Sequence, residues 1–272
     1  MHSARHNIQI HTVFLFILVW INYTIITFIM IEINNLYKSF GDNKVLSGVN
    51  LQINKGETIA IIGKSGCGKS VLIKHIVGLL YPDSGYVKVE GQRIDQLGMK
   101  ELYKLRKKFG FLFQGAALFD SMTVGENIAL PLTESQNEFS KSEIAGTIAE
   151  KLELVGLPDT ENLKPSELSG GMKKRVGLAR ALVTNPTYIL YDEPTTGLDP
   201  IMSDSIDSLI KELSEKIKVT SVVVTHDMYS VKNIADKVAM MYEGIIYFTG
   251  TPTELVDSKD QVIIDFIKRT NI

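Results

Sequence analysis

Gly63-Lys64-Ser65-Gly66-Cys67-Gly68-Lys69-Ser70 is the stretch of this sequence that decides the fold. Residues 57–62, directly before it, form an apolar run typical of a buried β-strand, and apolar residues at positions 71, 72, 73, 76, 77 and 80 predict a helix after it. A glycine-rich loop of this spacing between a strand and a helix is the pattern of a phosphate-binding loop. The stretch therefore predicts an α/β fold built around a nucleotide site.

The residues of this loop each have a chemical reason to be there. Glycines allow backbone N–H groups to turn inward around a phosphate, and the helix N-terminus adds partial positive charge. Lys69 is expected to bridge the β- and γ-phosphates, and the Ser70 hydroxyl is expected to ligate Mg²⁺. Cys67 occupies a variable position and is interpreted as a small filler, whose thiol would be reactive if it is exposed near the helix N-terminus.

The composition is that of a globular protein. The chain has 272 residues, of which 44% are hydrophobic and 22% charged, and this length suits one large domain or a domain with a small lobe. The net charge of −2 gives no overall attraction to nucleic acid. The single cysteine cannot form a disulfide within the chain, which fits a reducing compartment.

Two acidic residues and a histidine follow further predicted strands. Residues 187–191 are mostly apolar and lead to Asp192 and Glu193, and residues 221–225 form a second core strand that ends at His226. α/β proteins place their chemistry at the carboxyl ends of such strands. Adjacent residues on a strand point in opposite directions, so we expect the two carboxylates to have different roles.

The pentapeptide Leu168-Ser169-Gly170-Gly171-Met172 narrows these observations to one family. It precedes a basic run at residues 173–175 and a short helix, ahead of the strand at 187–191. In this order it resembles the signature motif of the ATP-binding cassette (ABC) ATPases. The resemblance covers residues 30–272 and implies a P-loop NTPase fold, with a RecA-like core, an antiparallel β subdomain and an inserted α-helical subdomain at about residues 115–168.

The same resemblance implies roles for individual residues that handle ATP and Mg²⁺. Asp192 matches the aspartate that holds Mg²⁺ through water, and Glu193 matches the catalytic base. His226 matches the histidine that contacts the γ-phosphate. Gln114, at the end of the predicted strand 109–113, matches the glutamine that senses Mg²⁺ and the attacking water.

The remaining matches concern the adenine ring and a second subunit. Phe40 matches the aromatic residue that stacks on adenine, with Tyr37 as the alternative. Residues 197–200 match the D-loop, in which Asp199 is also expected to cap the next helix. In the family the signature reads ATP bound to another copy, so the resemblance implies a homodimer whose ATP sites include Ser169, Gly170 and Gly171.

The predicted helical lobe has two features of its own. Residues 140–143 form a capping-box sequence that opens a helix. An apolar stripe at helical spacing follows and is expected to pack within the lobe: Ile144, Ile148, Leu152 and Val155. In the family, the segment that corresponds to residues 115–124 receives a coupling helix of a membrane subunit.

Several segments further resemble the ATPases of Mce-type lipid transporters. They are residues 113–124, residues 126–132, Met172 in place of the usual signature glutamine, residues 250–252 and the tail at 265–267. This resemblance implies ATP-driven transport of phospholipid or sterol-type lipid across the cell envelope. It also implies integral-membrane permease subunits, an Mce-domain substrate-binding protein and a peripheral position on the cytoplasmic face of the inner membrane. None of these segments contacts lipid in the family, so the cargo rests on the resemblance alone.

Two rival functions stay open. One is an ABC importer ATPase for a small polar solute such as an amino acid or a metal. The other is a non-transport ABC ATPase that acts on DNA or ribosomes. The chain has no long heptad run of the kind that chromosome-maintenance members insert, and it carries one cassette where ribosome-acting members usually carry two.

The N-terminus differs in character from the rest of the chain. Residues 13–31 contain no charged side chain and reach the length of a membrane-spanning helix. Residues 1–29 could be a membrane anchor, a secretory signal or translated sequence upstream of the true start. No small-residue cleavage pattern follows them, which argues against secretion. Residues 31–37 already form the first predicted strand and leave no linker for an anchor, so we favour a start at Met30.

Overall fold

The larger of two sheets organises the structure, a computed structural model that describes residues 29–133 and 139–269. Its strand order is β10-β9-β3-β8-β7-β6. The strands from β9 to β6 run parallel, and β10 is antiparallel to β9. The bounds are β3 (Thr58–Ile62), β6 (Phe109–Leu112), β7 (Tyr188–Asp192), β8 (Thr220–Val224), β9 (Lys237–Tyr242) and β10 (Ile245–Gly250).

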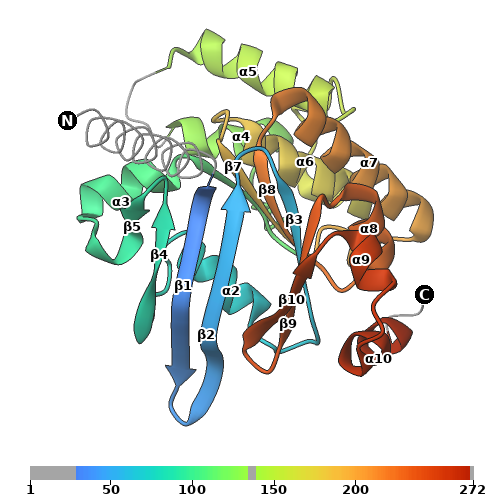
Figure 1. Cartoon of the computed structure of the whole chain (residues 1–272). Helices are drawn as coiled ribbons and strands as arrows, with labels where there is room; N and C mark the ends of the chain where they lie inside the picture. Colours follow the sequence, from blue (N-terminus) through green and yellow to red (C-terminus); the bar gives the residue numbers. More distant parts are fainter. Residues whose placement is uncertain (1–28, 134–138, 270–272) are drawn as a thin grey trace, which may run out of the picture.

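The smaller sheet is antiparallel and has the order β2-β1-β4-β5. It meets the larger sheet near β10, where the Ser47 backbone N–H donates to the Gly244 carbonyl at 2.8 Å. Figure 1 shows β1 and β2 in blue at the front of the molecule. The bounds are β1 (Ile29–Phe40), β2 (Asn43–Asn54), β4 (Ser84–Val89) and β5 (Gln92–Arg93). The predicted α/β fold with a separate antiparallel subdomain is confirmed.

Alternation along the parallel strands divides the core into layers. In β3, Ile59 and Ile61 face the small sheet and the helix at residues 69–76, whereas Ala60 and Ile62 face the helices near the C-terminus. In β7, Ile189 and Tyr191 instead pack toward the helices at residues 170–182 and 200–217. The helices that complete the core region are α2 (Lys69–Ile76), α3 (Met99–Arg106), α7 (Pro200–Ile217), α8 (Met228–Ile234), α9 (Pro252–Val256) and α10 (Gln261–Arg269), with a 3₁₀ turn η1 (Ile94–Gln96).

Helix α2 is shorter than its apolar pattern predicted. The pattern ran to Leu80, but the helix ends at Ile76. Gly78 adopts a φ of +66°, and a Cβ built there would lie 2.8 Å from Ile94 and from Leu102. The chain therefore turns at a glycine that passes close to two buried side chains, and the prediction of helix up to Leu80 was wrong.

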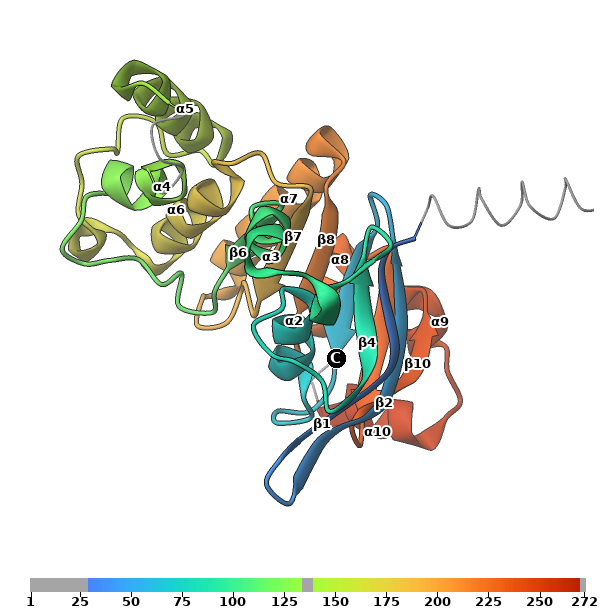
Figure 2. The ribbon, with the colours of Figure 1, turned by 90° about the vertical axis from the view of Figure 1, so that its left-hand side faces the viewer.

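Helices α4 (Val124–Thr133), α5 (Lys141–Leu154) and α6 (Gly170–Leu182) form a lobe beside the sheets. A 3₁₀ turn, η2 (Pro165–Glu167), lies between α5 and α6. Figure 2 shows this lobe apart from the four-stranded sheet. The predicted capping box is confirmed, because Ser140 N–H donates to Glu143 Oε2 at 2.7 Å and Glu143 N–H donates to Ser140 Oγ at 3.3 Å. The predicted stripe packs into the lobe core, with Leu152 fully buried.

The N-terminal extension proposed for residues 1–29 lies, up to residue 28, outside the described residues. Within the ranges that the structure does describe, no helix combines the length and the apolar character needed to cross a bilayer.

A buried carboxylate lies between α7 and α8. Asp207 is 1% exposed. Burial raises the pKa of Asp207 to about 6; the nearby Ser230 hydroxyl opposes the shift, and the charges of Asp227 and Asp204 add to it. The folded-state pKa thus lies above the unfolded value, so Asp207 favours folding when protonated and opposes it as the pH rises through about 6.

Replacing Asp207 by Asn should therefore increase the free energy of unfolding at pH 7.5 by about 1–3 kcal/mol, because a buried charge is removed. Urea unfolding at pH 7.5 and at pH 4 measures the effect, which should nearly vanish at the lower pH. Asp204→Asn, an exposed neighbour on the same helix, is the control. A loss of stability in Asp207→Asn at pH 7.5 would contradict the assignment.

Candidate functional site

Four neighbouring strands bring the predicted site residues to one edge of the parallel sheet. The order β3-β8-β7-β6 places their carboxyl ends side by side. β3 leads into Gly63, β7 ends at Asp192, and His226 and Gln114 follow β8 and β6 by two residues each. This edge of an open α/β sheet is where such folds bind their ligands.

The loop after β3 is a backbone cradle in which three glycines adopt positive φ angles. Gly63 adopts a φ of +151°, and a Cβ there would lie 2.6 Å from the Met241 carbonyl. Gly68 has a φ of +103° at the start of α2 and is crowded by β2. Gly66 has a φ of +79° and open space around it. The loop leads directly into the N-terminus of α2, a position where an anion is stabilised.

Lys69 is the cation of this cradle. Its side chain is 7% exposed, and Nζ donates to the Gly63 carbonyl at 2.8 Å and to the Lys64 carbonyl at 3.3 Å. The ammonium is therefore held at the mouth of the loop by carbonyl groups that water or phosphate oxygens can replace. Ser70, the next residue, is exposed.

Glu193 and His226 are in direct contact. His226 Nδ1 lies 2.8 Å from Glu193 Oε2, and the Thr196 hydroxyl donates to the same oxygen at 3.1 Å. Glu193 has a φ of +50°, a left-handed conformation that a non-glycine residue rarely adopts. Its N–H donates to the Val224 carbonyl at 2.8 Å, which holds this strained backbone in place. The carboxylate and the imidazole therefore form a pair at the end of β7 and β8.

Asp192 lies half-buried beside this pair. Burial, and then the charge of Glu193, raises the pKa of Asp192 above its usual value, while Lys74, Lys69 and Lys174 oppose the shift. A divalent cation at this position would relieve the repulsion between the carboxylates. The oxygens of Asp192 and Ser70 are the hard ligands that Mg²⁺ prefers. Among the described residues, no cluster of three or more His, Cys, Asp or Glu side chains could hold a metal.

The signature residues form the exposed N-terminus of α6. Ser169 is the N-cap, and its hydroxyl accepts from Met172 N–H at 3.2 Å. A Cβ at Gly171 would lie 1.8 Å from Met202 Cε on α7, so only glycine fits there without moving that side chain. Among the described residues, no hydrogen bond joins residues 169–171 to the phosphate cradle of the same chain. The predicted cap at Asp199 is confirmed, since it accepts from Met202 N–H at 3.0 Å.

Phe40 lies at the end of β1 and is 48% exposed, with Lys38 Nζ at 5.6 Å from its ring centre. The alternative residue, Tyr37, lies against Gly48, where a Cβ would be 2.8 Å from its hydroxyl. Phe40 therefore has the freer ring of the two. Among the described residues, neither the Phe40 ring nor the Tyr37 ring makes a hydrogen bond or a stacked contact with residues 63–70.

Lys174 is a site residue that sequence reasoning missed. It is 5% exposed, and its ammonium donates to the Gln114 carbonyl and, at 3.2 Å, to the Glu193 carbonyl. The available signal was its position three residues after Gly171 and four before Leu178, on the buried face of α6. A lysine on an otherwise small or apolar face indicates a specific partner, because an unpaired buried charge is costly.

Cys67 is half-buried rather than exposed. Burial raises the pKa of its thiol, although the charge of Lys69 opposes the shift. Because the thiolate is the reactive form, we expect slow alkylation at neutral pH, with a rate that continues to rise above pH 9.0. Mass spectrometry of iodoacetamide labelling from pH 7 to 10 measures this, with the urea-unfolded chain as control. A rate that levels off below about pH 8 would contradict it.

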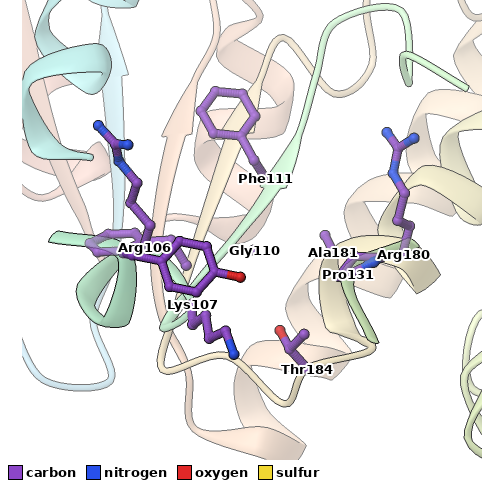
Figure 3. A pocket seen from close by; sticks show the side chains of 10 residues that line it. Arg106, Lys107, Gly110, Phe111, Pro131, Arg180, Ala181 and Thr184 are labelled. Carbon is purple, nitrogen blue, oxygen red and sulfur yellow. The ribbon is translucent and has the colours of Figure 1, made fainter. Parts of the chain in front are cut away.

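A groove of about 420 Å³ is lined by residues of α3, β6, α4 and α6 and of the segments that follow α3 and α6. Figure 3 shows Arg106 and Arg180 on opposite sides of it. Both guanidinium groups bind backbone carbonyls, Arg106 those of Val77 and Gly78, and Arg180 those of Ala116 and Ala117. Its lining is Tyr103, Arg106, Lys107, Phe109, Gly110, Phe111, Pro131, Arg180, Ala181 and Thr184.

Comparison with known proteins agrees with this geometry. The family model described as ABC transporter matches residues 46–196. The intermembrane phospholipid transport system ATP-binding protein MlaF of Haemophilus influenzae is 42% identical, over 88% of this chain and 90% of that protein. The methionine import ATP-binding protein MetN of Carboxydothermus hydrogenoformans is 44% identical, over 83% of this chain and 67% of that protein.

A solved structure has the same fold. It is the dimeric structure of a post-hydrolysis state of an ATP-binding cassette bound to ADP and Pi, with a TM-score of 0.74 and 34% identity. The match covers 82% of this chain and 99% of that one.

Proposed function

This chain belongs to the ABC transporter family, and we propose that it is the ATP-hydrolysing subunit of a system that transports lipid across the cell envelope. ATP binding and hydrolysis follow from the family. The roles of the site residues are assigned chiefly from one contact. His226 Nδ1 lies 2.8 Å from Glu193 Oε2, at the same sheet edge as the phosphate cradle.

ATP binding is assigned to the cradle and to β1. The N–H groups of residues 63–70 hold the phosphates, and Lys69 exchanges its loop carbonyls for β- and γ-phosphate oxygens. The exposed ring of Phe40 stacks on adenine. Ser70, Asp192 and Gln114 would hold Mg²⁺, which would supply positive charge to neutralise the phosphates.

Hydrolysis is assigned to Glu193. Its carboxylate orients the attacking water and accepts a proton from it, and the bonds from Thr196 and His226 fix the carboxylate for this role. His226 also reaches the γ-phosphate through its second ring nitrogen, Nε2. Gln114 positions the same water from the end of β6.

The signature residues act on ATP held by a second copy. Ser169 and Gly170 are exposed at the N-terminus of α6, which points partial positive charge outward. In a homodimer this terminus would stabilise the negative charge that develops on the γ-phosphate of the partner's ATP. The dimeric cassette among the solved relatives supports this arrangement.

The lipid cargo is supported by the phospholipid-transport relative and by the segments at 113–132 and Met172. The methionine importer relative supports the alternative, an importer for a small polar solute. We favour lipid because the MlaF match covers nearly the whole length of both chains. The proposed partners are integral-membrane permease subunits and an Mce-domain protein, with the subunit at the cytoplasmic face of the inner membrane.

Purification of the native complex through a tag on this chain tests the cargo. The proposal expects a multi-span permease and an Mce-domain protein to co-purify in detergent, and phospholipid in the purified complex. A periplasmic solute-binding protein in place of the Mce-domain protein would favour the importer. Lys69→Ala serves as a control, because it should leave assembly unchanged while hydrolysis is lost.

A further inference from the structure

Lys174 connects the signature helix to two parts of the chain that carry hydrolytic residues. It lies one turn after Gly171 on α6, with its side chain 5% exposed. Its ammonium donates to the main-chain carbonyls of Gln114 and Glu193, the latter at 3.2 Å. Each of these residues sits just beyond a different strand of the parallel sheet. A single buried side chain therefore joins α6, the end of β6 and the end of β7.

Two nearby carboxylates partly offset the cost of burying the Lys174 ammonium. Burial lowers the pKa of the Lys174 ammonium, and the negative charges of Glu193 and Asp192 act in the opposite direction. The ammonium in turn lowers the cost of keeping Asp192 charged. An apolar side chain of similar length could fill the space, but the Gln114 and Glu193 carbonyls would lose the ammonium that joins them to α6.

The same face of α6 stays in contact with the segment after Gln114. Gly177 passes so close that a Cβ there would lie 2.9 Å from Leu112 and 3.1 Å from Ala116. Arg180 then donates to the Ala116 and Ala117 carbonyls at 2.6 and 2.8 Å. Helix α6 and the segment at 114–117 are thus joined at successive turns, and Lys174 is the point at which Glu193 is also joined to them.

We infer that Lys174 is a positioning residue for hydrolysis, which fixes the backbone of Gln114 and Glu193 to the helix whose N-terminus reads the partner's ATP. The inference rests on the proposed roles of those residues. Closure of α6 on a partner's ATP then sets the position of the hydrolytic groups in its own subunit. Hydrolysis in one site is then faster when the other site is also engaged, although a single complete site can still turn over.

The substitution Lys174→Met removes the donor and the charge while keeping an unbranched side chain. The turnover number for ATP should fall by about 10- to 100-fold, since small displacements of reacting groups have effects of this size. The KM for ATP should change by less than about 3-fold, because the cradle and Lys69 do not contact Lys174. Lys174→Arg, which keeps charge and donors, should restore most of the turnover. Lys173→Met, the adjacent lysine on the same helix, should leave it unchanged.

ATP-dependent dimerisation separates positioning from a general distortion of α6. In a Glu193→Gln background, light scattering should show that Lys174→Met dimerises at the same ATP concentration as the parent. Loss of dimerisation, or a KM that rises as turnover falls, would mean that Lys174 only supports the helix and would overturn the inference. So would normal turnover in Lys174→Met. If that variant is too unstable to purify, Lys174→Leu, which likewise has neither a donor nor a charge, is tested with the same expected and contradicting results.

Failure of the proposed function gives a different result. If the proposed function is wrong, the wild-type protein and Lys173→Met would have no ATPase activity that Lys69→Ala abolishes. A defect confined to Lys174→Met, with active wild type and control, bears on Lys174 alone.

Discussion

Replacing Glu193 by Gln should lower the steady-state rate of ATP hydrolysis by about 10²–10⁴-fold while leaving ATP binding intact. The amide keeps the size of the side chain and can still lie near His226 and Thr196, but it cannot accept a proton from the attacking water. Phosphate release measures the rate, and equilibrium binding of a fluorescent ATP analogue measures affinity. ATP should also accumulate in a stable dimer of this variant, because the dimer can no longer be released by hydrolysis.

Thr196→Val is the matched comparison for this variant. It removes the 3.1 Å hydrogen bond to Glu193 Oε2 but keeps the carboxylate. Its rate should lie between those of wild type and Glu193→Gln. Turnover of Glu193→Gln within about 3-fold of wild type would refute the role of general base.

Replacing Lys69 by Ala should weaken ATP binding itself. Lys69 is 7% exposed, and its ammonium donates to the Gly63 and Lys64 carbonyls at the mouth of the cradle. Each hydrogen bond to a charged group contributes about 1.5–3 kcal/mol, so the loss of contacts to two phosphates should raise the Kd for ATP by about 10²-fold or more. Isothermal titration with ATP and Mg²⁺ measures the change.

Lys74→Ala is the control for Lys69→Ala. Lys74 lies on the same helix, α2, but its side chain is exposed. Its removal should change the Kd for ATP by less than about 3-fold, because an exposed charge is screened. If the two variants bind ATP equally well, the cradle is not the nucleotide site.

The elements of the site were predictable because their signals are local. A strand of five buried residues before Gly63 and a Ser-Gly-Gly turn before α6 can be read from a few neighbouring positions. The helix caps at Ser140 and Asp199 were predictable for the same reason, since a cap bonds a residue three positions away. The end of α2 was not, because Gly78 turns there against Ile94 and Leu102 from another segment.

The contacts within the site were not predictable from local pattern. The pair of Glu193 and His226 depends on the register of β7 with β8, in which Asp192 lies opposite Val224. Lys174 was visible only as part of a basic run, and its role depends on where β6 and β7 end relative to α6. Both are consequences of tertiary packing between segments far apart in the sequence.

We propose that each ATP site is completed by the signature of a second copy. Mixing two inactive variants checks this proposal. Ser169→Arg should block the signature but keep the cradle, and Lys69→Ala should disable the cradle but keep the signature. In the mixed dimer, one site combines the intact cradle of the first variant with the intact signature of the second. We therefore expect the mixture to hydrolyse ATP although neither variant does so alone. A mixture as inactive as its components, or full activity of Ser169→Arg alone, would contradict it.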